Sequence, residues 1–424
     1  MSKIAKGKYT AEAVAGFTHR TAMEEAARCL LCHDAPCSKG CPAGTDPAKF
    51  IRSIRFRNVK GAAETIRSAN VLGGSCARVC PYDNLCEEAC SRCGIDKPIE
   101  IGKLQRYAID QEKIFKMKTL VAPKEKKPGK IACVGAGPAS LACAAELAKA
   151  GYKVTVFERE AKPGGVLTYG IVPTRLPQAV VDHDIAQVKG LGVKIVCNTE
   201  VKAADLEEYD AVFIGTGLWK DNVPQIEGID LKGVYSAVDF LKEARTKKKD
   251  FGEELKDKRV VVVGGGDVTT DCAVTAKLLG AKDVRIVYRR TIEEAPGNIS
   301  EFHYALSLGI GITTGMAPDA IKGTKTRMKS ATFKGFYDKD AEMTVSADFI
   351  VFATGQKAED MSEVAPVKLD DKKGLIKAPK GKAGDKYFAG GDIVNGGKTV
   401  VEAVAEGKEA AAAMIAYLEK KGVK

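Results

Sequence analysis

The placement of cysteines constrains this chain more than any other feature of its sequence. Nine of the thirteen cysteines lie within the first 93 residues, in two separate runs. Each run contains a Cys-Pro pair, Cys41-Pro42 or Cys80-Pro81, that follows another cysteine with three residues between. Thiolates at this spacing hold 4Fe–4S clusters, and nine are enough for two cubes with one to spare. The runs consist of Cys29, Cys32, Cys37 and Cys41, and of Cys76, Cys80, Cys86, Cys90 and Cys93.

Structural zinc and disulfides are the two other roles open to clustered cysteines. Zinc sites share the Cys-x2-Cys spacing of Cys29 and Cys32, but the two Cys-Pro runs favour clusters. The first ten residues carry lysines without an apolar segment, so no signal peptide is expected. The sequence also has no run of 18 to 20 apolar residues, and we expect no membrane span. Many thiols without an export signal indicate a reducing compartment, so the expected location is the cytoplasm.

The net charge of +11 is concentrated in the amino-terminal third of the chain. Residues 1–127 contain 23 Lys and Arg against 14 Asp and Glu. A basic segment can bind nucleic acid, but the aromatic platforms and readout motifs of that role are missing, and we expect no nucleic-acid partner. Thiolates around two clusters leave about three or four negative charges that need cationic surroundings. An acidic partner surface or plain solvation accounts for the remaining charge.

The order of apolar patterns predicts a helical domain followed by two nucleotide-binding domains. Residues 1–118 have helix-like apolar spacing, with the cysteines on the turns between helices, and a polar linker spans 119–129. A strand–glycine turn–helix–strand pattern begins at Lys130 and recurs at Lys258. We expect an α-helical two-cluster iron–sulfur domain and two α/β Rossmann-like domains, arranged as in flavin disulfide reductases and adrenodoxin reductase. The expected helices are 22–31, 47–56, 62–68 and 99–115; the expected domains are 1–118 for the clusters, 130–228 with 366–424 for FAD, and 229–365 for the nicotinamide nucleotide.

Four motifs in the helical segment carry a specific resemblance. They are Cys29-Leu-Leu-Cys-His-Asp-Ala-Pro-Cys37, Thr45-Asp-Pro-Ala-Lys-Phe-Ile-Arg-Ser-Ile54, Lys60-Gly-Ala-Ala-Glu-Thr-Ile-Arg67 and Pro98-Ile-Glu-Ile-Gly-Lys-Leu-Gln-Arg106. With them the chain resembles, over essentially its whole length, the NAD(P)H-oxidising small subunit of bacterial dihydropyrimidine dehydrogenase. It is also similar to the amino-terminal half of the eukaryotic single-chain enzyme and, more distantly, to the small subunit of glutamate synthase.

The resemblance implies a division of the ligands between two 4Fe–4S clusters. It assigns one cluster to Cys29, Cys32, Cys37 and Cys90. It assigns the other to Cys41, Cys80, Cys86 and Gln105, whose amide oxygen replaces the eighth thiolate. Cys76 and Cys93 are then left without iron, and Cys76 is the first substitute for Gln105.

The first glycine turn predicts an FAD site. Gly135, Gly137, Pro138, Ala139 and Ser140 follow a strand and open a helix, so backbone N–H groups can approach a pyrophosphate. Glu158 ends the next strand and suits a ribose hydroxyl. Ser140 replaces the usual third glycine. Further expected FAD contacts are Gly165 and Val166, Arg175, Thr216 and Gly217, Gly391 and Asp392, and Thr399 and Val400 at the start of a helix aimed at the flavin.

The second glycine turn predicts the nicotinamide nucleotide site, formed by Gly264, Gly266, Asp267 and Val268. The strand after this turn ends in Arg289-Arg290, where the FAD half has a carboxylate. Guanidinium groups bind a 2′-phosphate, so the sequence favours NADPH over NADH. Glu301 lies near an acidic position that the resemblance places beside the nicotinamide.

The combined motifs predict an oxidoreductase that passes electrons from NAD(P)H through FAD and two clusters to a partner. The resemblance implies a catalytic subunit with FMN and iron–sulfur clusters as that partner, in a heteromer such as a heterotetramer, which reduces uracil or thymine to 5,6-dihydropyrimidines. A glutamate synthase-type small subunit, or a reductase for another acceptor, is the alternative. A scaffold that only holds nucleotide and metal is a second alternative, which a dye-reduction assay with NAD(P)H distinguishes.

Overall fold

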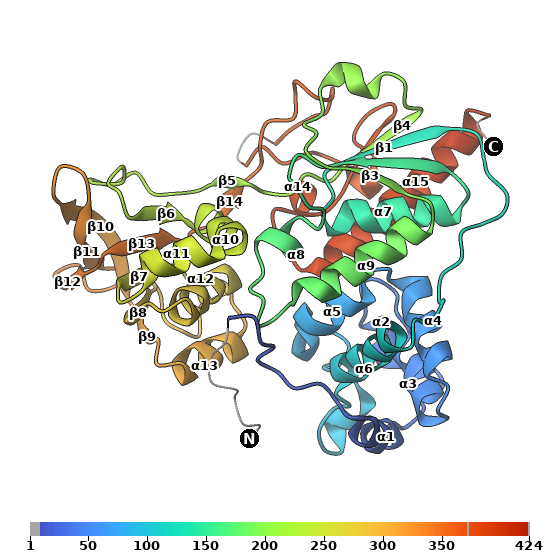
Figure 1. Cartoon of the computed structure of the whole chain (residues 1–424), viewed down its shortest axis with the longest axis horizontal. Coiled ribbons are helices and arrows are strands. Elements are labelled where there is room, and N and C mark those ends of the chain that lie inside the picture. The colour runs from blue at the N-terminus through green and yellow to red at the C-terminus, as the bar shows by residue number, and fades with distance from the viewer. Residues whose placement is uncertain (1–8, 371–372, 423–424) are drawn as a thin grey trace.

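The computed structural model describes residues 9–370 and 373–422. Its amino-terminal part consists of short helices without a sheet (Figure 1). The four predicted helices occur with ends shifted by a few residues, and Gly73–Val79 is an additional one. Cys37, Cys76 and Cys93 lie within helical turns, so the prediction that every cysteine sits between helices is wrong. The elements are α1 (His19–Ala27), α2 (Pro36–Lys39), α3 (Pro47–Arg55), α4 (Val59–Ala69), α5 (Gly73–Val79), the 3-10 turns η1 (Tyr82–Asn84) and η2 (Ser91–Gly94), and α6 (Ile101–Ile114).

The helical domain has a small apolar core of its own. Phe50 and Ile54 of α3, Ile66 of α4 and Leu104 of α6 are fully buried there. Pro47 opens α3 behind the capping carboxylate of Asp46, which accepts a hydrogen bond from the backbone of Lys49. Cys29, Cys37, Cys86 and Cys90 are half-buried against this core. The core therefore fixes the segments that carry the thiols.

The first α/β unit is built on a five-stranded parallel sheet of order β15-β4-β1-β2-β3. The strand β15 comes from the far end of the chain, so this unit is discontinuous in sequence. Helices α7, α9 and α15 cover one face of the sheet (Figure 1). The elements are β1 (Lys130–Val134), α7 (Pro138–Lys149), β2 (Lys153–Phe157), α8 (Val166–Tyr169), α9 (Gln178–Gly190), β3 (Lys194–Val196), the 3-10 turn η3 (Ala203–Leu206), β4 (Ala211–Ile214), β15 (Tyr387–Ala389), α14 (Asp392–Asn395) and α15 (Val400–Lys420).

The second α/β unit repeats this plan with a parallel sheet of order β6-β13-β7-β8-β9. Helices pack on one face, and an antiparallel sheet, β10-β11-β12, packs on the other through Phe333 and Ile321. The elements are β6 (Val234–Ser236), α10 (Ala237–Thr246), α11 (Lys248–Leu255), β7 (Arg259–Val263), α12 (Asp267–Leu278), β8 (Asp283–Val287), α13 (Ile299–Ser307), β9 (Gly311–Thr313), β10 (Met316–Gly323), β11 (Met328–Gly335), β12 (Glu342–Ser346) and β13 (Phe349–Phe352).

Two short strands join the α/β units. The chain leaves the first unit through β5 (Lys220–Asp221) and returns through β14 (Gln356–Lys357), and these strands pair in antiparallel fashion. A further 3-10 turn, η4 (Pro379–Gly381), precedes β15. In the part of the chain that the structure describes, no helix has the length and hydrophobicity needed to cross a membrane.

The helical domain packs directly on the first α/β unit. Val71 and Leu72 join the same apolar cluster as Leu141 of α7 and Val404 of α15. Lys408 of α15 reaches into the helical domain, where its Nζ donates to the carbonyl of Ala69 over 2.6 Å. This contact brings α15 alongside the cysteine-bearing segments.

Candidate functional site

The first candidate site is a hollow of about 350 Å³ in the helical domain, called here the first hollow. Cys29, Cys32, Cys37 and Cys90 all line it. Cys29 and Cys32 follow α1, Cys37 lies in the first turn of α2, and Cys90 immediately precedes η2. The rest of its wall includes apolar side chains. The structure therefore brings together the four thiols that the resemblance assigns to one cluster.

The second hollow, of about 360 Å³, is lined by Cys41, Cys80, Cys86 and Gln105. Cys76 of α5 lines the same hollow and is almost fully buried. Both Gln105 and Cys76 thus reach the site, and the choice between them as the eighth ligand stays a prediction. Cys93 does not line either hollow; its exposed thiol donates to the backbone carbonyls of Glu87 and Glu88.

The thiols that line the two hollows are partly or fully buried. Burial, followed by the neighbouring Cys90 thiol, raises the pKa of Cys37 to about 11. A hydrogen bond with Cys76, followed by burial, raises the pKa of Cys80 well above its ordinary value. Crowded thiols without a counter-charge resist ionisation. A cationic metal core is the partner that lets them bind as thiolates.

A further observation fits a bound group in the second hollow. The hydroxyl of Thr45, which lines the second hollow, is buried and has no hydrogen-bond partner among the described residues. An unpaired hydroxyl beside the thiols is expected where a bound group completes the site.

The two hollows share a wall. Ile101, the first residue of α6, lines both of them. The second hollow is also lined by Val401, in the first turn of α15. Because α15 belongs to the first α/β unit, the second hollow lies between this unit and the first hollow.

The glycines of the first α/β unit converge at the carboxyl edge of its sheet. Gly135, with φ +86°, follows β1, and a Cβ there would lie 2.8 Å from the carbonyl of Gly215 after β4. A Cβ on Gly165 would lie 2.9 Å from Gly137, and one on Gly391 would lie 2.8 Å from Ala139. These contacts place the backbone close to the start of α7, where Pro138 occupies the first helical position. The result is a cradle of backbone N–H groups suited to a pyrophosphate.

Buried polar atoms in this cradle lack partners among the described residues. Ser140 is fully buried, its hydroxyl is unpaired, and a Cβ on Gly215 would lie 2.3 Å from it. Because Gly215 has no side chain, the Ser140 hydroxyl fits at the position where the usual motif has its third glycine. The hydroxyl of Thr216 is also buried and unpaired, and Gly217 follows with φ +73°. Such atoms are expected where a polar ligand completes the site.

Glu158 closes the cradle at the end of β2. Its carboxylate accepts hydrogen bonds from the backbone N–H groups of Ala136 and Glu160 over 2.8 and 2.9 Å. Burial raises the pKa of Glu158, although these bonds oppose the rise. A carboxylate offers about four acceptor positions, so about two remain for a ribose.

The carboxy-terminal contacts predicted for FAD lie beside the same cradle. Burial raises the pKa of Asp392 to about 6, and its carboxylate accepts a bond from the backbone of Lys398. Thr399 caps α15 in a capping box with Glu402, and Val400 is the first residue of the helix. Val166, the first residue of α8, is partly exposed near Gly165.

Arg175 joins the two α/β units through ion pairs. Its guanidinium is 3.1 Å from Asp271 of α12 and 3.2 Å from Glu301 of α13. Glu301, predicted near the nicotinamide, is thus an ion-pair partner of Arg175.

The second glycine turn has the same construction with a more open helix start. Gly264 has φ +153°, and a Cβ there would lie 2.5 Å from the carbonyl of Ala353. A Cβ on Gly266, the N-cap of α12, would have no described atom within 4 Å. Asp267 accepts a hydrogen bond from the backbone of Asn298, and Val268 is partly exposed. This leaves open space at the helix start for a second pyrophosphate.

Arg289 and Arg290 are exposed and follow β8 after one buried residue, Tyr288. The guanidinium of Arg289 lies 5.7 Å from the ring centre of Phe336, a cation–π distance that restrains the side chain. Both arginines therefore stand at the strand end where an adenosine ribose is bound in this fold.

Two residues of the second hollow were not predicted as site residues. Thr45 opens one of the motifs of the resemblance and Val401 is ordinary in its local pattern, but only the packing of distant segments brings them to the hollow. The adjacent glycines Gly73 and Gly74 are the one local hint of a close approach at the start of α5.

Two family models together span nearly the whole chain. Residues 6–117 match the model described as dihydropyrimidine dehydrogenase domain II, 4Fe-4S cluster, and residues 129–407 match pyridine nucleotide-disulphide oxidoreductase. The chain is 46% identical, over 97% of its length and 98% of the relative, to the NAD-dependent dihydropyrimidine dehydrogenase subunit PreT of Escherichia coli O157:H7. It is 33% identical, over 95% and 93% of the two chains, to the glutamate synthase [NADPH] small chain of E. coli K12.

Among solved structures, the chain is similar to Mycobacterium tuberculosis FprA in complex with NADPH. The TM-score is 0.60 at 20% identity, over 70% of this chain and 86% of that one. This likeness concerns the fold. The predicted fold class, a helical iron–sulfur domain before a pyridine nucleotide oxidoreductase fold, is confirmed, and so is the resemblance on which the ligand predictions depend.

Proposed function

Because the chain is an oxidoreductase that belongs to the family of PreT subunits of dihydropyrimidine dehydrogenase, we propose that it supplies electrons for pyrimidine reduction. In this proposal NAD(P)H is oxidised here, and a partner subunit reduces uracil or thymine to the 5,6-dihydropyrimidine. The observation that carries the proposal is the position of α15 beside both sites: its Ala403 would lie 3.7 Å from a Cβ on Gly391 of the cradle, and its Val401 lines the second hollow.

Each hollow would hold one 4Fe–4S cluster. Cys29, Cys32, Cys37 and Cys90 would ligate the first, and Cys41, Cys80, Cys86 and Gln105 the second. The matched segment of the chain is a 4Fe-4S domain, and the unpaired Thr45 hydroxyl supports a bound group in the second hollow. When bound, a cluster of this kind supplies a one-electron relay.

The cradle of the first α/β unit would hold FAD. Gly135, Gly137 and the start of α7 would face the pyrophosphate, Glu158 the ribose, and Asp392 the ribityl chain. Pro138, Ala139, Ser140, Gly165, Val166, Arg175, Thr216, Gly217, Gly391, Thr399 and Val400 would complete this site. FAD supplies the conversion of a two-electron hydride into single electrons.

The shared walls support an order for the electron path. The second hollow touches α15, and Ile101 separates it from the first hollow. Electrons from the flavin site would therefore reach the second hollow before the first. The first hollow would be the exit toward the partner.

The second glycine turn would bind the nicotinamide nucleotide through Gly264, Gly266, Asp267 and Val268. Arg289 and Arg290 favour NADPH, since guanidinium groups suit a 2′-phosphate. The similar PreT subunits are named NAD-dependent, and the name of the glutamate synthase small chain includes NADPH. NADH is therefore the competing electron donor, and an assay that compares NADPH with NADH decides between them.

The proposed partner is a catalytic subunit with FMN and iron–sulfur clusters, in a heteromer such as a heterotetramer in the cytoplasm. The basic helical domain would face an acidic surface of that subunit. A glutamate synthase-type assembly is the second candidate, because the 33% identical relative is the small chain of that enzyme.

The testing experiment is co-expression with the neighbouring open reading frame and anaerobic purification of the complex. The complex is assayed with NADPH or NADH against uracil, thymine, and glutamine plus 2-oxoglutarate. We expect pyrimidine-dependent oxidation of the nucleotide. Turnover only with glutamine and 2-oxoglutarate would favour the second candidate instead.

A further inference from the structure

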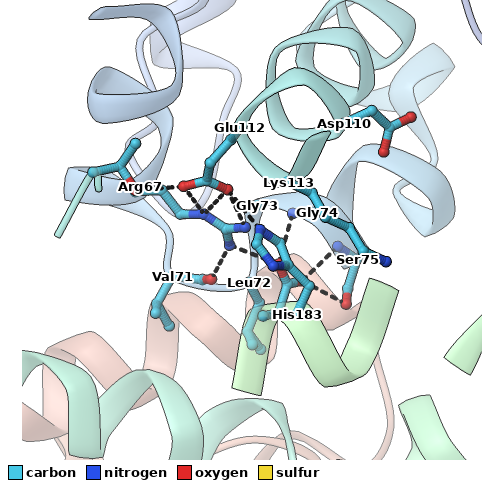
Figure 2. Close-up of polar contacts among 12 residues, drawn as sticks. Arg67, Val71, Leu72, Gly73, Gly74, Ser75, Asp110, Glu112, Lys113 and His183 are labelled. Atoms are coloured by element: carbon cyan, nitrogen blue, oxygen red, sulfur yellow. Dashed lines mark hydrogen bonds and ion pairs between the residues drawn. The ribbon is translucent and has the colours of Figure 1, made fainter. Parts of the chain in front are cut away.

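A fully buried ion network joins the helical domain to the first α/β unit. Arg67 of α4 lies between two carboxylates. It pairs with Glu112 of α6 (Figure 2) at 2.7 Å, and with Asp184 of α9 at 2.6 Å. None of these three side chains is exposed. His183 contacts Glu112 over 3.0 Å, and Arg67 also donates to the carbonyl of Val71. Buried charges are costly unless fully paired, so the network fixes the two parts to one another.

Asp184 also binds the start of α5, which belongs to the other domain. Its carboxylate accepts from the backbone N–H of Ser75 over 2.7 Å, from the Ser75 hydroxyl over 2.7 Å, and from the backbone N–H of Gly74 over 3.3 Å. The residue before α5, Leu72, provides no side-chain cap. Asp184 is therefore the cap of α5, supplied from a different domain.

This cap requires a glycine. A Cβ on Gly74 would lie 2.8 Å from Asp184 Oδ1 and 3.1 Å from Ile109, so any larger residue would push the carboxylate away. Gly73 has a close approach of its own, because a Cβ there would lie 2.5 Å from Ile66.

The start of α5 in turn holds Gln105. The side-chain Nε2 of Gln105 donates to the carbonyl oxygen of Gly73 over 2.8 Å. A carbonyl only accepts hydrogen bonds, so it selects the NH2 end of the amide. Oε1 is then the end that is left for iron. The same helix carries Cys76 and ends immediately before Cys80, which both line the second hollow.

We propose that Asp184 and Arg67 are a positioning pair that fixes the Gln105 amide as a ligand of the cluster in the second hollow. This inference rests on the proposed function, since it concerns the residues that would hold that cluster. Arg67 holds the Asp184 carboxylate, Asp184 holds the first turn of α5, and Gly73 orients the amide. Without the pair, Gln105 and Cys76 compete for the eighth position, because both line the hollow.

The test compares Asp184→Asn with Asp182→Asn in the full-length protein, purified anaerobically. Asp182 lies on the same helix and its substitution removes the same charge, but Asp182 is exposed and accepts its hydrogen bond from Gln178 of the same helix. Iron content, EPR spectra and midpoint potentials of the two clusters are measured, together with bound FAD. A second pair, Gln105→Cys alone and combined with Asp184→Asn, completes a double-mutant cycle.

We expect Asp184→Asn to leave FAD and iron content unchanged and to alter the EPR signal of one cluster only. The one-electron equilibrium of that cluster should change at least tenfold, about 59 mV. Asp182→Asn should change neither cluster. In the Gln105→Cys background, Asp184→Asn should have no further effect on the potential, because no amide remains to be oriented.

Three results would overturn the inference. They are an unchanged EPR spectrum in Asp184→Asn, an equal change in both clusters, and the same change from Asp184→Asn in the parent and in the Gln105→Cys variant. If Asp184→Asn does not fold, Ser75→Ala replaces it, since this variant removes only one bond to Asp184. It should change the same cluster in the same direction by a smaller amount; no change would again overturn the inference. The two clusters of the parent protein are measured before any variant is compared, and their absence would overturn the proposed function instead.

Discussion

The carboxylate of Asp271 and the guanidinium of Arg175 lie 3.1 Å apart and link the two α/β units. Burial raises the pKa of Asp271 to about 7, although Arg175 opposes the rise; Glu301 and Asp267 add to it. The unfolded chain releases this proton near the ordinary pKa of about 4. The native state therefore binds more protons than the unfolded state between about pH 4 and 7, and stability falls as the pH rises through this window.

We predict that Asp271→Asn removes this pH dependence. We expect the urea midpoint of the variant to rise relative to that of the parent as the pH increases from about 5 to about 7.5. This range spans the raised pKa of Asp271. Parallel pH profiles of the two midpoints would show that Asp271 titrates normally.

A second prediction concerns Cys86, which lines the second hollow. Cys86→Ala should spare reduction of FAD by the nicotinamide nucleotide and abolish pyrimidine reduction by the complex, because the relay to the partner loses a ligand. Stopped-flow flavin bleaching and steady-state assays measure the two steps. Cys93→Ala is the matched control, since Cys93 lies outside both hollows, and should keep both activities. Full pyrimidine reduction by Cys86→Ala would refute the order of the path.

The two glycine turns should respond differently to alanine. Gly135→Ala should lose FAD, because its φ of +86° is unfavourable and the Cβ would lie 2.8 Å from a carbonyl oxygen. Gly266→Ala has an ordinary backbone and open space around its Cβ. It should keep FAD and raise the KM for the nicotinamide nucleotide, whose pyrophosphate would need that space. Flavin absorbance per chain and steady-state kinetics measure these effects. Retention of FAD by Gly135→Ala would place the flavin elsewhere.

Replacement of Arg289 and Arg290 by Gln should raise the KM for NADPH by about tenfold or more and leave that for NADH nearly unchanged. One charge-assisted hydrogen bond contributes about 1.5–3 kcal/mol, which covers this range. Lys282→Gln, at the opposite end of β8, is the control. Equal changes for both nucleotides would remove the argument from the 2′-phosphate.

Arg67→Ala should destabilise the protein by about 3–5 kcal/mol, since it leaves two buried carboxylates without their cation. Burial alone would raise the pKa of Glu112, but its contacts with His183, Arg67 and Thr119 lower this pKa to about 2, so the group stays charged. The midpoint of the first unfolding transition in urea measures the effect. Arg20→Ala, which breaks the exposed pair with Glu24, should leave that midpoint unchanged. Similar midpoints for both variants would mean that the network is not tightly coupled.

Much of the architecture was predictable because its signals are local. The Cys-Pro runs and the two glycine turns are fixed by neighbouring residues, and periodic apolar positions located α3 and α6 to within two residues. The start of α5 was not predictable, because its cap, Asp184, lies more than a hundred residues away in the chain. The ion pairs of Arg175 show the same limit, because nothing near this residue in the sequence indicates its partners Asp271 and Glu301 in the other α/β unit.

The central claim is that the amino-terminal thiols hold two redox-active clusters beside the flavin cradle. Iron and acid-labile sulfide analysis of anaerobically purified protein, with EPR after dithionite reduction, tests it most directly. We predict about eight iron atoms and about eight sulfides per chain, and signals from two interacting 4Fe–4S centres. Protein with neither iron nor sulfide, and without an EPR signal after reduction, would contradict the claim.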